Sequence, residues 1–555
     1  MWQWLYGSMI GWIFRQQVYL LAFLAGCIGR AISRIFKARK QKALLPALQE
    51  QSEMSEREAG CKRVVLDFAA TLGYMTRECM EKKELESLID SGITPDDLAK
   101  ELHKRVEEIP GVTLGKRHFQ NGYTDIKLPY SLRDRHVYIC GRSGSGKTNI
   151  LRFMATQDIW HGCGIGVLVP EKELIEEQIL PYIPAERVDD VVYINPADSE
   201  YPVAFNPLHL DIGEDIGQKV DDFVTVFKRA VGDTGFRMDQ ILSETLYALI
   251  RRPGSTLDDI ERFLSRSNPA FRNEVLKSAD ERTRFFFEDT YPSMDRNAAN
   301  PVLSRISGFT KRDKVRNILC QPGQSFSFRR AMDEGKIILI NLSDGMLGEQ
   351  ASQLLGQIFI AQFQLAAMSR ADTVQAERVP FYLYLDEFQS FCGVAETSYE
   401  KILSRARRYA LGLILAHQQT GQISQKLLKE ILGNVTTFIT FNVSYEDATK
   451  LSSEYAYEYG QQMEFVEPKE FLRLRQGEAL CKIDRTVFPI ETYLMPQQPD
   501  HRRAQAIIER SRQNYGRGGG GNPGGNGGGR PTPLPKLPSS GGSANDPELD
   551  PKKVF

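Results

Sequence analysis

A glycine-rich loop carries the clearest chemical signal in the sequence. An apolar strand is expected at residues 136–140, the loop follows it directly, and a helical pattern begins at Asn149. In this strand–loop–helix setting the pattern GxxxxGK[ST] predicts a phosphate-binding loop, because glycines let successive backbone N–H groups turn toward phosphate oxygens. Lys147 is expected to reach the β- and γ-phosphates, and the Thr148 hydroxyl to hold Mg²⁺. The predicted nucleotide-binding residues are Gly141, Arg142, Ser143, Gly144, Ser145, Gly146, Lys147 and Thr148.

Two adjacent carboxylates form a second candidate element. Residues 381–385 are continuously apolar, as expected for a strand buried on both faces, and Asp386 and Glu387 follow at its carboxyl end. Asp386 is expected to bind Mg²⁺ that accompanies a nucleotide, and Glu387 to act as the general base on an attacking water. An acidic pair at the end of a strand is common at surface turns, so this assignment depends on the complete phosphate-binding loop upstream.

A third group of candidates follows the carboxylates. A strand is expected at 411–416, and Gln418 lies just beyond it, where a side-chain amide can hydrogen-bond to a γ-phosphate or to the attacking water. We therefore interpret Gln418 as a candidate γ-phosphate sensor. Arg405, Arg407 and Arg408 precede this strand; they form either a solvated helix face or an arginine finger that reaches a neighbouring subunit, for which Arg407 is the first choice.

The spacing of these motifs indicates how the elements that carry them are arranged. About 240 residues separate Lys147 from Asp386, far more than a compact nucleotide-binding core needs, so a segment must be inserted. Strands are expected at 165–169, 191–194 and 336–342. Between about 211 and 330 the apolar residues instead recur with helical spacing. The members of this pattern are Ile216, Val220, Phe223, Val224, Phe227, Val231, Ile241, Leu242, Thr245, Leu246 and Leu249.

Composition limits where a nucleic acid could bind. The 555 residues carry a net charge of -1, which excludes a basic coat over the whole chain, so any contact with DNA must be local. The eight cysteines are scattered, with no CxxC pair and no histidines at metal-binding spacing. This distribution favours a reducing, cytosolic main body.

The two ends of the chain differ from its middle. Two apolar blocks, residues 2–14 and 18–28, are interrupted by Arg15 and followed by a basic run from Arg30 to Lys42. Neither block alone reaches the ~20 residues of a membrane span, so the segment fits a spanning helix, an interfacial helix or a helix bound to a partner. At the other end, residues 516–529 are nearly all glycine and a proline-rich stretch follows. These residues predict a disordered tail or a short docking segment.

These residues together resemble the TraG/TraD-type coupling ATPases of conjugation and type IV secretion, within the HerA/FtsK superfamily of P-loop motor ATPases. The resemblance covers roughly residues 110–495 and is carried by five stretches: 135–148, Phe205-Asn-Pro-Leu208, 333–342, Leu385-Asp-Glu-Phe-Gln389 and 407–418. It implies a RecA-like α/β motor with an inserted all-α domain, a homohexameric ring, ATP at the subunit boundaries and DNA in a central channel. In that family the arginine eleven positions before the sensor glutamine is the finger, which corresponds to Arg407.

We therefore expect an α/β fold: a RecA-like P-loop NTPase core with an inserted all-α domain, an N-terminal hydrophobic segment and a disordered Gly/Pro-rich C-terminal tail. The expected ranges are 1–44 for a hydrophobic, basic, membrane-associating segment, 45–110 for a helical N-terminal region, 111–210 and 331–500 for the two parts of the ATPase core, 211–330 for the inserted domain and 501–555 for the tail.

The expected function is an ATP-hydrolysing DNA translocase that feeds DNA or nucleoprotein into a type IV secretion or conjugation apparatus. Its cofactors would be ATP and Mg²⁺, and its partners DNA, further copies of itself, the secretion channel and relaxase or relaxosome proteins. It would lie at the inner membrane through its N-terminus with a cytoplasmic ATPase domain. The alternatives are a soluble, cytoplasmic HerA-like helicase for DNA processing or defence, and a substrate-recruitment platform with little ATPase activity.

Overall fold

The computed structural model describes residues 90–516 apart from short gaps at 120–121, 211–214, 232–234, 268, 324, 393–395, 460–461, 485 and 496–498, together with residues 84, 87 and 88. The hydrophobic segment 1–44 and the glycine-rich run from residue 517 lie outside these residues. Within the described part, no helix is long and apolar enough to cross a bilayer. The chain divides into two compact units: residues up to 150 with 418–421 and 435–493, and residues 151–417 with 422–434 and those from 494 onward.

The first unit is built on mainly antiparallel strands. Its strands are β1 (Gly111–Phe119), β2 (Gly122–Pro129), β3 (Val137–Cys140), β9 (Thr437–Thr440), β10 (Ala456–Tyr459), β11 (Gln462–Phe465), β12 (Glu478–Ile483) and β13 (Thr486–Glu491). They follow the order β2, β1, β13, β12, β9, and each neighbouring pair is antiparallel. β3 then pairs in parallel with β9, while β10 and β11 pair with each other. The phosphate-binding loop therefore follows a strand whose register is set by β9.

Two helices of the first unit begin at a side-chain cap. The helices of this unit are α6 (Pro95–Glu108), α7 (Tyr130–Arg133), the start of α8 (Lys147–Trp160), α23 (Tyr445–Ser452) and α24 (Pro468–Leu472). α6 begins where Thr94 accepts a hydrogen bond from the amide of Asp97 and where a proline occupies the first turn. α23 begins in the same way, with Ser444 accepting from the amide of Asp447.

The second unit contains a parallel sheet. Its strands are β4 (Gly164–Val169), β5 (Val191–Ile194), β6 (Ile337–Asn341), β7 (Phe381–Leu385) and β8 (Leu411–His417), in the order β8, β7, β4, β6, β5. Every residue of these five strands is buried, as expected for apolar runs covered on both faces. The predicted strands, including that at 136–140, are all confirmed, each with at most one residue of difference at either end.

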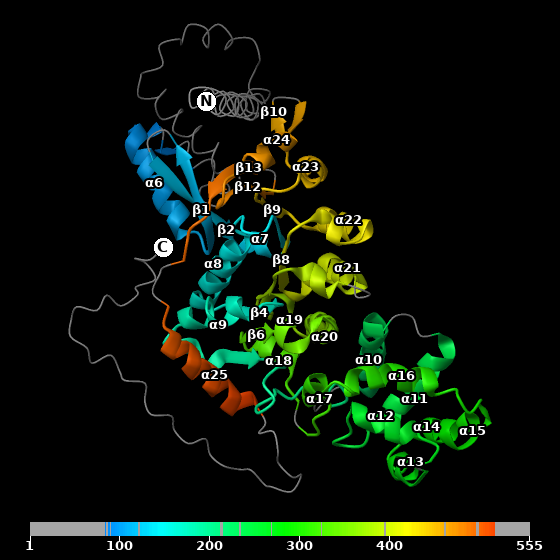
Figure 1. Cartoon of the computed structure of the whole chain (residues 1–555). Coiled ribbons are helices and arrows are strands. Elements are labelled where there is room, and N and C mark those ends of the chain that lie inside the picture. The colour runs from blue at the N-terminus through cyan, green and yellow to red at the C-terminus, as the bar shows by residue number, and fades with distance from the viewer. Residues whose placement is uncertain are drawn as a thin grey trace, which may run out of the picture. The chain divides into compact units, whose positions relative to one another are not determined.

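Helices alone fill the chain between β5 and β6 in the described residues (Figure 1). They are α10 (Ile216–Val231), α11 (Phe236–Ile250), α12 (Leu257–Leu264), α13 (Pro269–Leu276), α14 (Glu281–Phe285), the π-helical η3 (Phe286–Thr290), α15 (Tyr291–Ser293), α16 (Asn300–Thr310), α17 (Asp313–Leu319) and α18 (Phe328–Asp333). The predicted all-α insertion in an α/β core is thereby confirmed as a feature of the fold. Its exact domain range, 211–330, stays a prediction.

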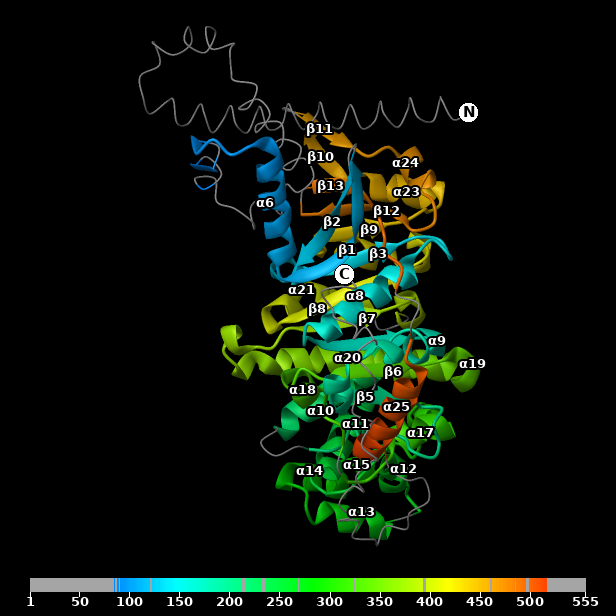
Figure 2. The ribbon, with the colours of Figure 1, turned by 90° about the vertical axis from the view of Figure 1, so that its left-hand side faces the viewer.

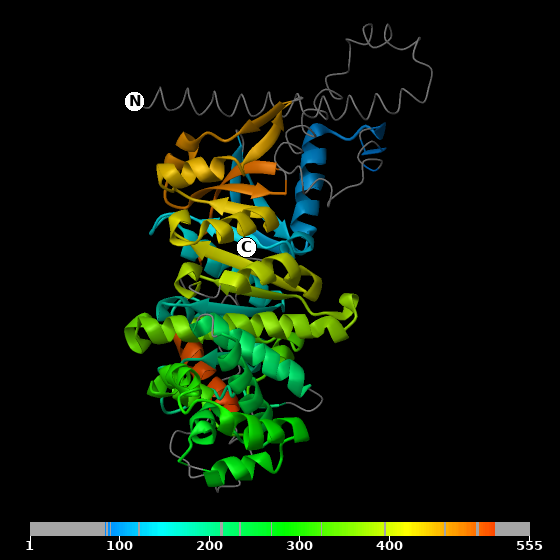
Figure 3. The same cartoon turned by 90° about the vertical axis from the view of Figure 1, so that its right-hand side faces the viewer.

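The remaining helices of the second unit connect or cover its strands. They are α9 (Lys172–Glu176), η1 (Leu180–Tyr182), η2 (Ala185–Asp190), α19 (Asp344–Leu347), α20 (Glu349–Ser369), η4 (Arg370–Asp372), η5 (Gln375–Glu377), η6 (Phe388–Phe391), α21 (Glu396–Arg405), η8 (Ala406–Tyr409), α22 (Gln425–Asn434) and α25 (His501–Tyr515); η9 (Thr420–Gln422) crosses the boundary between the units. The long helix α20 packs on the sheet (Figure 3), where the ring of Phe363 lies 5.8 Å from that of Phe381 in β7.

One expectation about the C-terminus is wrong for part of its range. Residues 501–515, assigned to the disordered tail, form α25, which runs beside β5 (Figure 2). Ala504 and Ile507 are buried, and the Ser511 hydroxyl accepts a hydrogen bond from the amide of Tyr193 in β5 at 2.8 Å. Ion pairs from the arginines of α25 add to these buried contacts in docking this polar segment, so the glycine run marks the end of the described fold better than residue 501 does.

Candidate functional site

The backbone of the phosphate-binding loop is fixed from several sides within the first unit. The amide of Arg142 donates to the carbonyl of Asn442 at 2.8 Å, and the amide of Ser145 donates back to Arg142 at 3.2 Å. The carbonyl of Ser145 in turn accepts from the amide of Gly477 at 2.9 Å. The loop between β9 and α23 and the start of β12 therefore hold the loop open as a preformed turn.

Two glycines supply backbone conformations that other residues adopt only with strain. Gly144 has φ of +73° and Gly146 has φ of +126°. A β-carbon on Gly146 would lie 2.8 Å from the ring of Phe441, whereas one on Gly144 would meet nothing within 4 Å. Both turns keep the loop narrow and its N–H groups free of side-chain cover, which is the property that the glycine pattern predicts.

The side chains of the loop fit a phosphate group. Lys147 is buried, and its ammonium group lies 3.3 Å from the carbonyl oxygen of Arg142, folded over the loop. The hydroxyl of Ser145 is buried and has no hydrogen-bond partner among the described residues. The 14-residue helix α8 begins at Lys147 and directs its positive end toward the loop. A buried lysine, an unsatisfied hydroxyl and a helix N-terminus together form a site for an anion with several oxygens.

Gln418 lies in the same unit as the loop. Its carbonyl oxygen accepts a weak hydrogen bond from the thiol of Cys140, at the end of β3, over 4.0 Å. Two residues further on, Thr420 donates from its amide at 3.0 Å and from its hydroxyl at 2.5 Å to one carboxylate oxygen of Asp447. The other oxygen of Asp447 accepts from Ser444, which caps α23. The candidate sensor is thus anchored next to the strand that carries the phosphate-binding loop.

The carboxylate pair belongs to the second unit. Asp386 follows β7 and is 6% exposed, and its carboxylate accepts a hydrogen bond from the amide of Glu387 at 3.0 Å. Glu387 has φ of 46° and ψ of 46°, a left-handed conformation that is strained for a residue with a β-carbon. Its carboxylate accepts from the side-chain amide of Gln389 at 2.7 Å. The hydrogen bond from Gln389 gives the Glu387 carboxylate a neighbour that orients it.

The three arginines lie at the end of α21 and in η8, also in the second unit. Arg405 closes α21, and Arg407 and Arg408 belong to the single 3-10 turn of η8. All three side chains are exposed. η8 ends at Ala410, whose left-handed backbone (φ 56°) turns the chain into β8. Exposure of these arginine side chains fits both interpretations, a solvated face and a finger.

The structure thus places the predicted residues in two groups. The loop residues and Gln418 are in the first unit, and Asp386, Glu387 and Arg407 are in the second. Sequence reasoning missed Asp447, for which the pattern Ser444-Tyr-Glu-Asp447, typical of a helix start, is a usable signal. It also missed Arg370 and Arg378, for which the sequence offers no signal.

The sequence also matches a known family over part of its length. Residues 265–461 match the family described as type IV secretory system conjugative DNA transfer. The matched segment begins in the inserted helices, downstream of the phosphate-binding loop, which it does not include, and it runs through Asp386, Glu387, Arg407 and Gln418. No curated protein sequence matches the chain.

Solved structures are similar to this chain at low sequence identity. The plasmid coupling protein TrwB in complex with ADP and Mg²⁺ has a TM-score of 0.50 and 15% identity, covering 68% of this chain and 90% of that one. VirB4 of Thermoanaerobacter pseudethanolicus has a TM-score of 0.47 and 14% identity, covering 70% and 97%. The match to TrwB supports the P-loop NTPase fold. With the family match, it confirms the resemblance of this chain to the coupling ATPases of conjugation and type IV secretion.

Proposed function

We propose that this protein is an ATP-hydrolysing DNA translocase, a coupling protein that feeds DNA or nucleoprotein into a type IV secretion apparatus. The observation that carries the proposal is the preformed loop at 141–148, with a buried Lys147 and an unsatisfied Ser145 hydroxyl. Residues 265–461 match a family described as type IV secretory system conjugative DNA transfer. The plasmid coupling protein TrwB, which shares the fold, has been solved in complex with ADP and Mg²⁺. Both support ATP and Mg²⁺ as the ligands of this chain.

The residues of the loop would bind the triphosphate. Backbone N–H groups of residues 141–146 would surround the phosphate oxygens, and Lys147 would neutralise their charge. Mg²⁺, held by the Thr148 hydroxyl and by Asp386, would offset the charge that develops on the phosphates. The ammonium group of Lys147 donates to the carbonyl oxygen of Arg142 in its own loop, and on binding it would exchange this acceptor for a phosphate oxygen.

Hydrolysis would depend on three further side chains. Glu387 would accept the proton of the attacking water, with Gln389 orienting its carboxylate through the hydrogen bond at 2.7 Å. Gln418 would hydrogen-bond to the γ-phosphate or to the attacking water. When the γ-phosphate leaves, a movement of Gln418 would be transmitted to α23 through the hydrogen bonds of Thr420 and Asp447. Arg407 would act on the nucleotide of a neighbouring subunit, and this role implies a ring, for which we propose a homohexamer.

The proposed motor would act on DNA at the inner membrane, together with the secretion apparatus. The ring would enclose DNA and contact the secretion channel and relaxase or relaxosome proteins. The N-terminal segment would hold it at the inner membrane, with the ATPase in the cytoplasm. A chain with a net charge of -1 would contact DNA through local Lys and Arg side chains, and the salt dependence of binding would count the phosphates that they contact.

Displacement of a third strand from a DNA triplex tests translocation directly. The full-length protein is expected to displace the strand in the presence of ATP and Mg²⁺, and Glu387→Gln is expected to bind ATP without displacing it. A soluble helicase would unwind a forked duplex and stay in solution without membranes. A recruitment platform would bind its substrates equally well in Glu387→Gln and displace nothing, and this result would exclude the translocase.

A further inference from the structure

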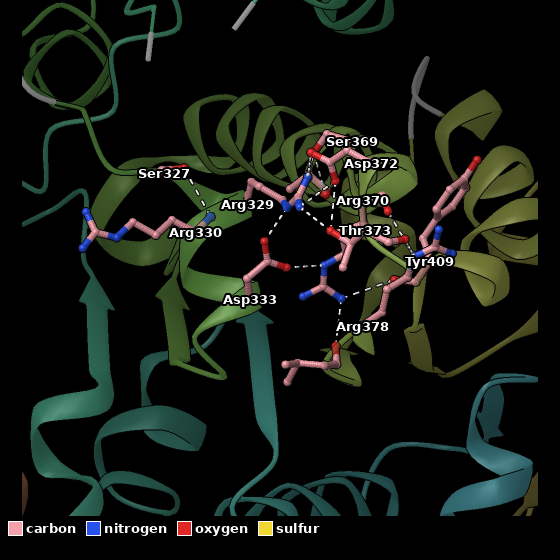
Figure 4. Close-up of polar contacts among 12 residues, drawn as sticks. Ser327, Arg329, Arg330, Asp333, Ser369, Arg370, Asp372, Thr373, Arg378 and Tyr409 are labelled. Atoms are coloured by element: carbon pink, nitrogen blue, oxygen red, sulfur yellow. Dashed lines mark hydrogen bonds and ion pairs between the residues drawn. The ribbon is translucent and has the colours of Figure 1, made fainter. Parts of the chain in front are cut away.

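Arg370 carries a guanidinium group that is completely buried in the second unit. Such an arginine is rare unless its charge and its N–H donors are matched. One terminal nitrogen donates to the carbonyl oxygens of Val379 at 2.9 Å and of Tyr409 at 3.2 Å. Nε forms an ion pair with a carboxylate oxygen of Asp333 at 2.9 Å without the geometry of a hydrogen bond, and the second terminal nitrogen has no hydrogen-bond partner among the described residues. Arg370 therefore ties the end of α20 to α18 and to η8 (Figure 4).

Arg378 reaches the same short helix from the loop before β7. Its Nε donates to the carbonyl oxygens of Arg370 and Thr373, both at 3.0 Å, and its Nη1 donates to the carbonyl of Arg408. Its guanidinium group also lies over the ring of Tyr409, 5.3 Å from the centroid. Arg378 thus contacts two consecutive residues of η8, one through its backbone and one through its ring.

The last carbonyl groups of η8 consequently all accept a hydrogen bond. The oxygen of Arg407 accepts from the amide of Ala410 at 3.2 Å, and the oxygens of the next two residues accept from the two guanidinium groups. Carbonyls at the end of a helical turn normally lack partners, and cations are favoured beside them. The backbone of Arg407 is therefore held rigidly, while its side chain is exposed.

A third arginine braces the loop from which Arg378 extends. Arg329 donates to the carboxylate of Asp372 at 2.9 and 3.3 Å, to the Ser369 hydroxyl at 3.3 Å and to the Thr373 hydroxyl at 3.0 Å. It also pairs with Asp333, the carboxylate that faces Arg370. Figure 4 shows these side chains converging between α18, the end of α20 and η8. A connected network of this kind favours a single arrangement of the turn.

We propose that Arg370 and Arg378 are positioning residues that clamp η8 and thereby direct Arg407 toward the nucleotide of a neighbouring subunit. This inference rests on the proposed function, in which Arg407 is the finger. The stabilisation that a finger provides depends on where its charge lies, and a displacement of about 1 Å can cost about a hundredfold in rate. Guanidinium groups that donate to the backbone carbonyls of η8 would fix the position from which Arg407 extends.

The variants Arg378→Ala and Arg378→Lys test this role in the full-length protein, because Arg378 is only half-buried and its removal leaves the core intact. DNA-stimulated ATP hydrolysis is expected to fall about tenfold to a hundredfold in kcat for Arg378→Ala, with KM for ATP unchanged. Lysine reaches one carbonyl but lacks the planar fork, so Arg378→Lys is expected to restore only part of the rate. Full recovery with lysine would show that charge alone acts and would overturn the clamp.

Arg330→Ala is the matched control. Arg330 lies next to Arg329 in α18, pairs with Glu334 at 2.7 Å and points away from the other labelled side chains in Figure 4. Its removal is expected to leave kcat unchanged. The double variant Arg378→Ala with Arg407→Ala is expected to be no slower than Arg407→Ala alone, because a clamp has no effect once the finger is absent.

Hydrogen exchange gives a readout that does not depend on turnover. Arg378→Ala is expected to speed exchange in peptides that cover residues 406–411, where the amide of Ala410 donates to Arg407, and to leave the phosphate-binding loop unchanged. If Arg407→Ala loses activity but Arg378→Ala changes neither exchange nor kcat, the clamp is wrong and the finger stands. If Arg407→Ala keeps full activity, both the finger and the clamp are wrong.

Discussion

One carboxylate oxygen of Asp447 accepts two hydrogen bonds from Thr420, from the amide at 3.0 Å and from the hydroxyl at 2.5 Å. Asp447 is 4% exposed and Thr420 is fully buried. Because Thr420 lies two residues after Gln418, this pair connects the candidate sensor to the first turn of α23. The connection is built from side chains far apart in sequence and does not involve the loop that binds phosphate.

Replacing Asp447 by alanine is expected to destabilise the protein. The buried amide and hydroxyl of Thr420 would lose their acceptor, which costs about 1–3 kcal/mol and lowers the melting temperature. Glu446→Ala is the control, since the Glu446 side chain is 77% exposed and pairs only at the surface with Lys450. Scanning fluorimetry of the two variants checks this, and equal melting temperatures would show that the buried pair contributes nothing.

The two strained glycines of the phosphate-binding loop are expected to differ in their tolerance of alanine. Gly144→Ala adds only the cost of a left-handed residue, about 1–2 kcal/mol, because its β-carbon meets open space. Gly146 has φ of +126°, a conformation that is essentially restricted to glycine. Gly146→Ala would also place a β-carbon against the ring of Phe441. Thermal melting without nucleotide is expected to rank Gly146→Ala below Gly144→Ala, and the reverse order would mean that the loop is not held as described.

Glu387 combines a proposed catalytic role with a strained backbone, so activity and stability are expected to separate there. Asparagine tolerates the left-handed conformation better than glutamine, by about 1 kcal/mol at most. Both Glu387→Asn and Glu387→Gln should lose ATP turnover. Of the two variants, Glu387→Asn should have the higher melting temperature. Paired turnover and melting measurements check this, and an active Glu387→Gln would remove the general-base assignment.

Cys140 is expected to be chemically inert in the folded protein. Burial raises the pKa of its thiol to about 12, with Asp447 adding to the shift, so at pH 8 only about one thiol in ten thousand is the reactive thiolate. Iodoacetamide at pH 8 should modify Cys140 only after denaturation, as peptide mass spectrometry can measure. Modification at the rate of an ordinary cysteine would mean that the strand behind the loop opens readily.

The sequence predicts the elements of this fold better than their contacts. Strands such as 191–194 and 381–385 are continuously apolar, and local pattern is enough to identify them. α25 escaped prediction because its buried face consists of little more than Ala504, Ile507 and Ser511 in a polar segment. The clamp could not be predicted, because the meaning of Arg370 depends on the carbonyl of Tyr409, a residue that only the fold brings close.

Steady-state ATP hydrolysis by the full-length protein, measured with and without single- and double-stranded DNA, shows whether the chain is a DNA-dependent ATPase. Lys147→Ala, which removes the phosphate-binding charge, and Glu387→Gln, which removes the base, serve as controls. We expect DNA to stimulate ATP turnover by the unmodified protein, and we expect both variants to lose this turnover. Turnover that ignores DNA, or that persists in the two variants, would contradict this expectation.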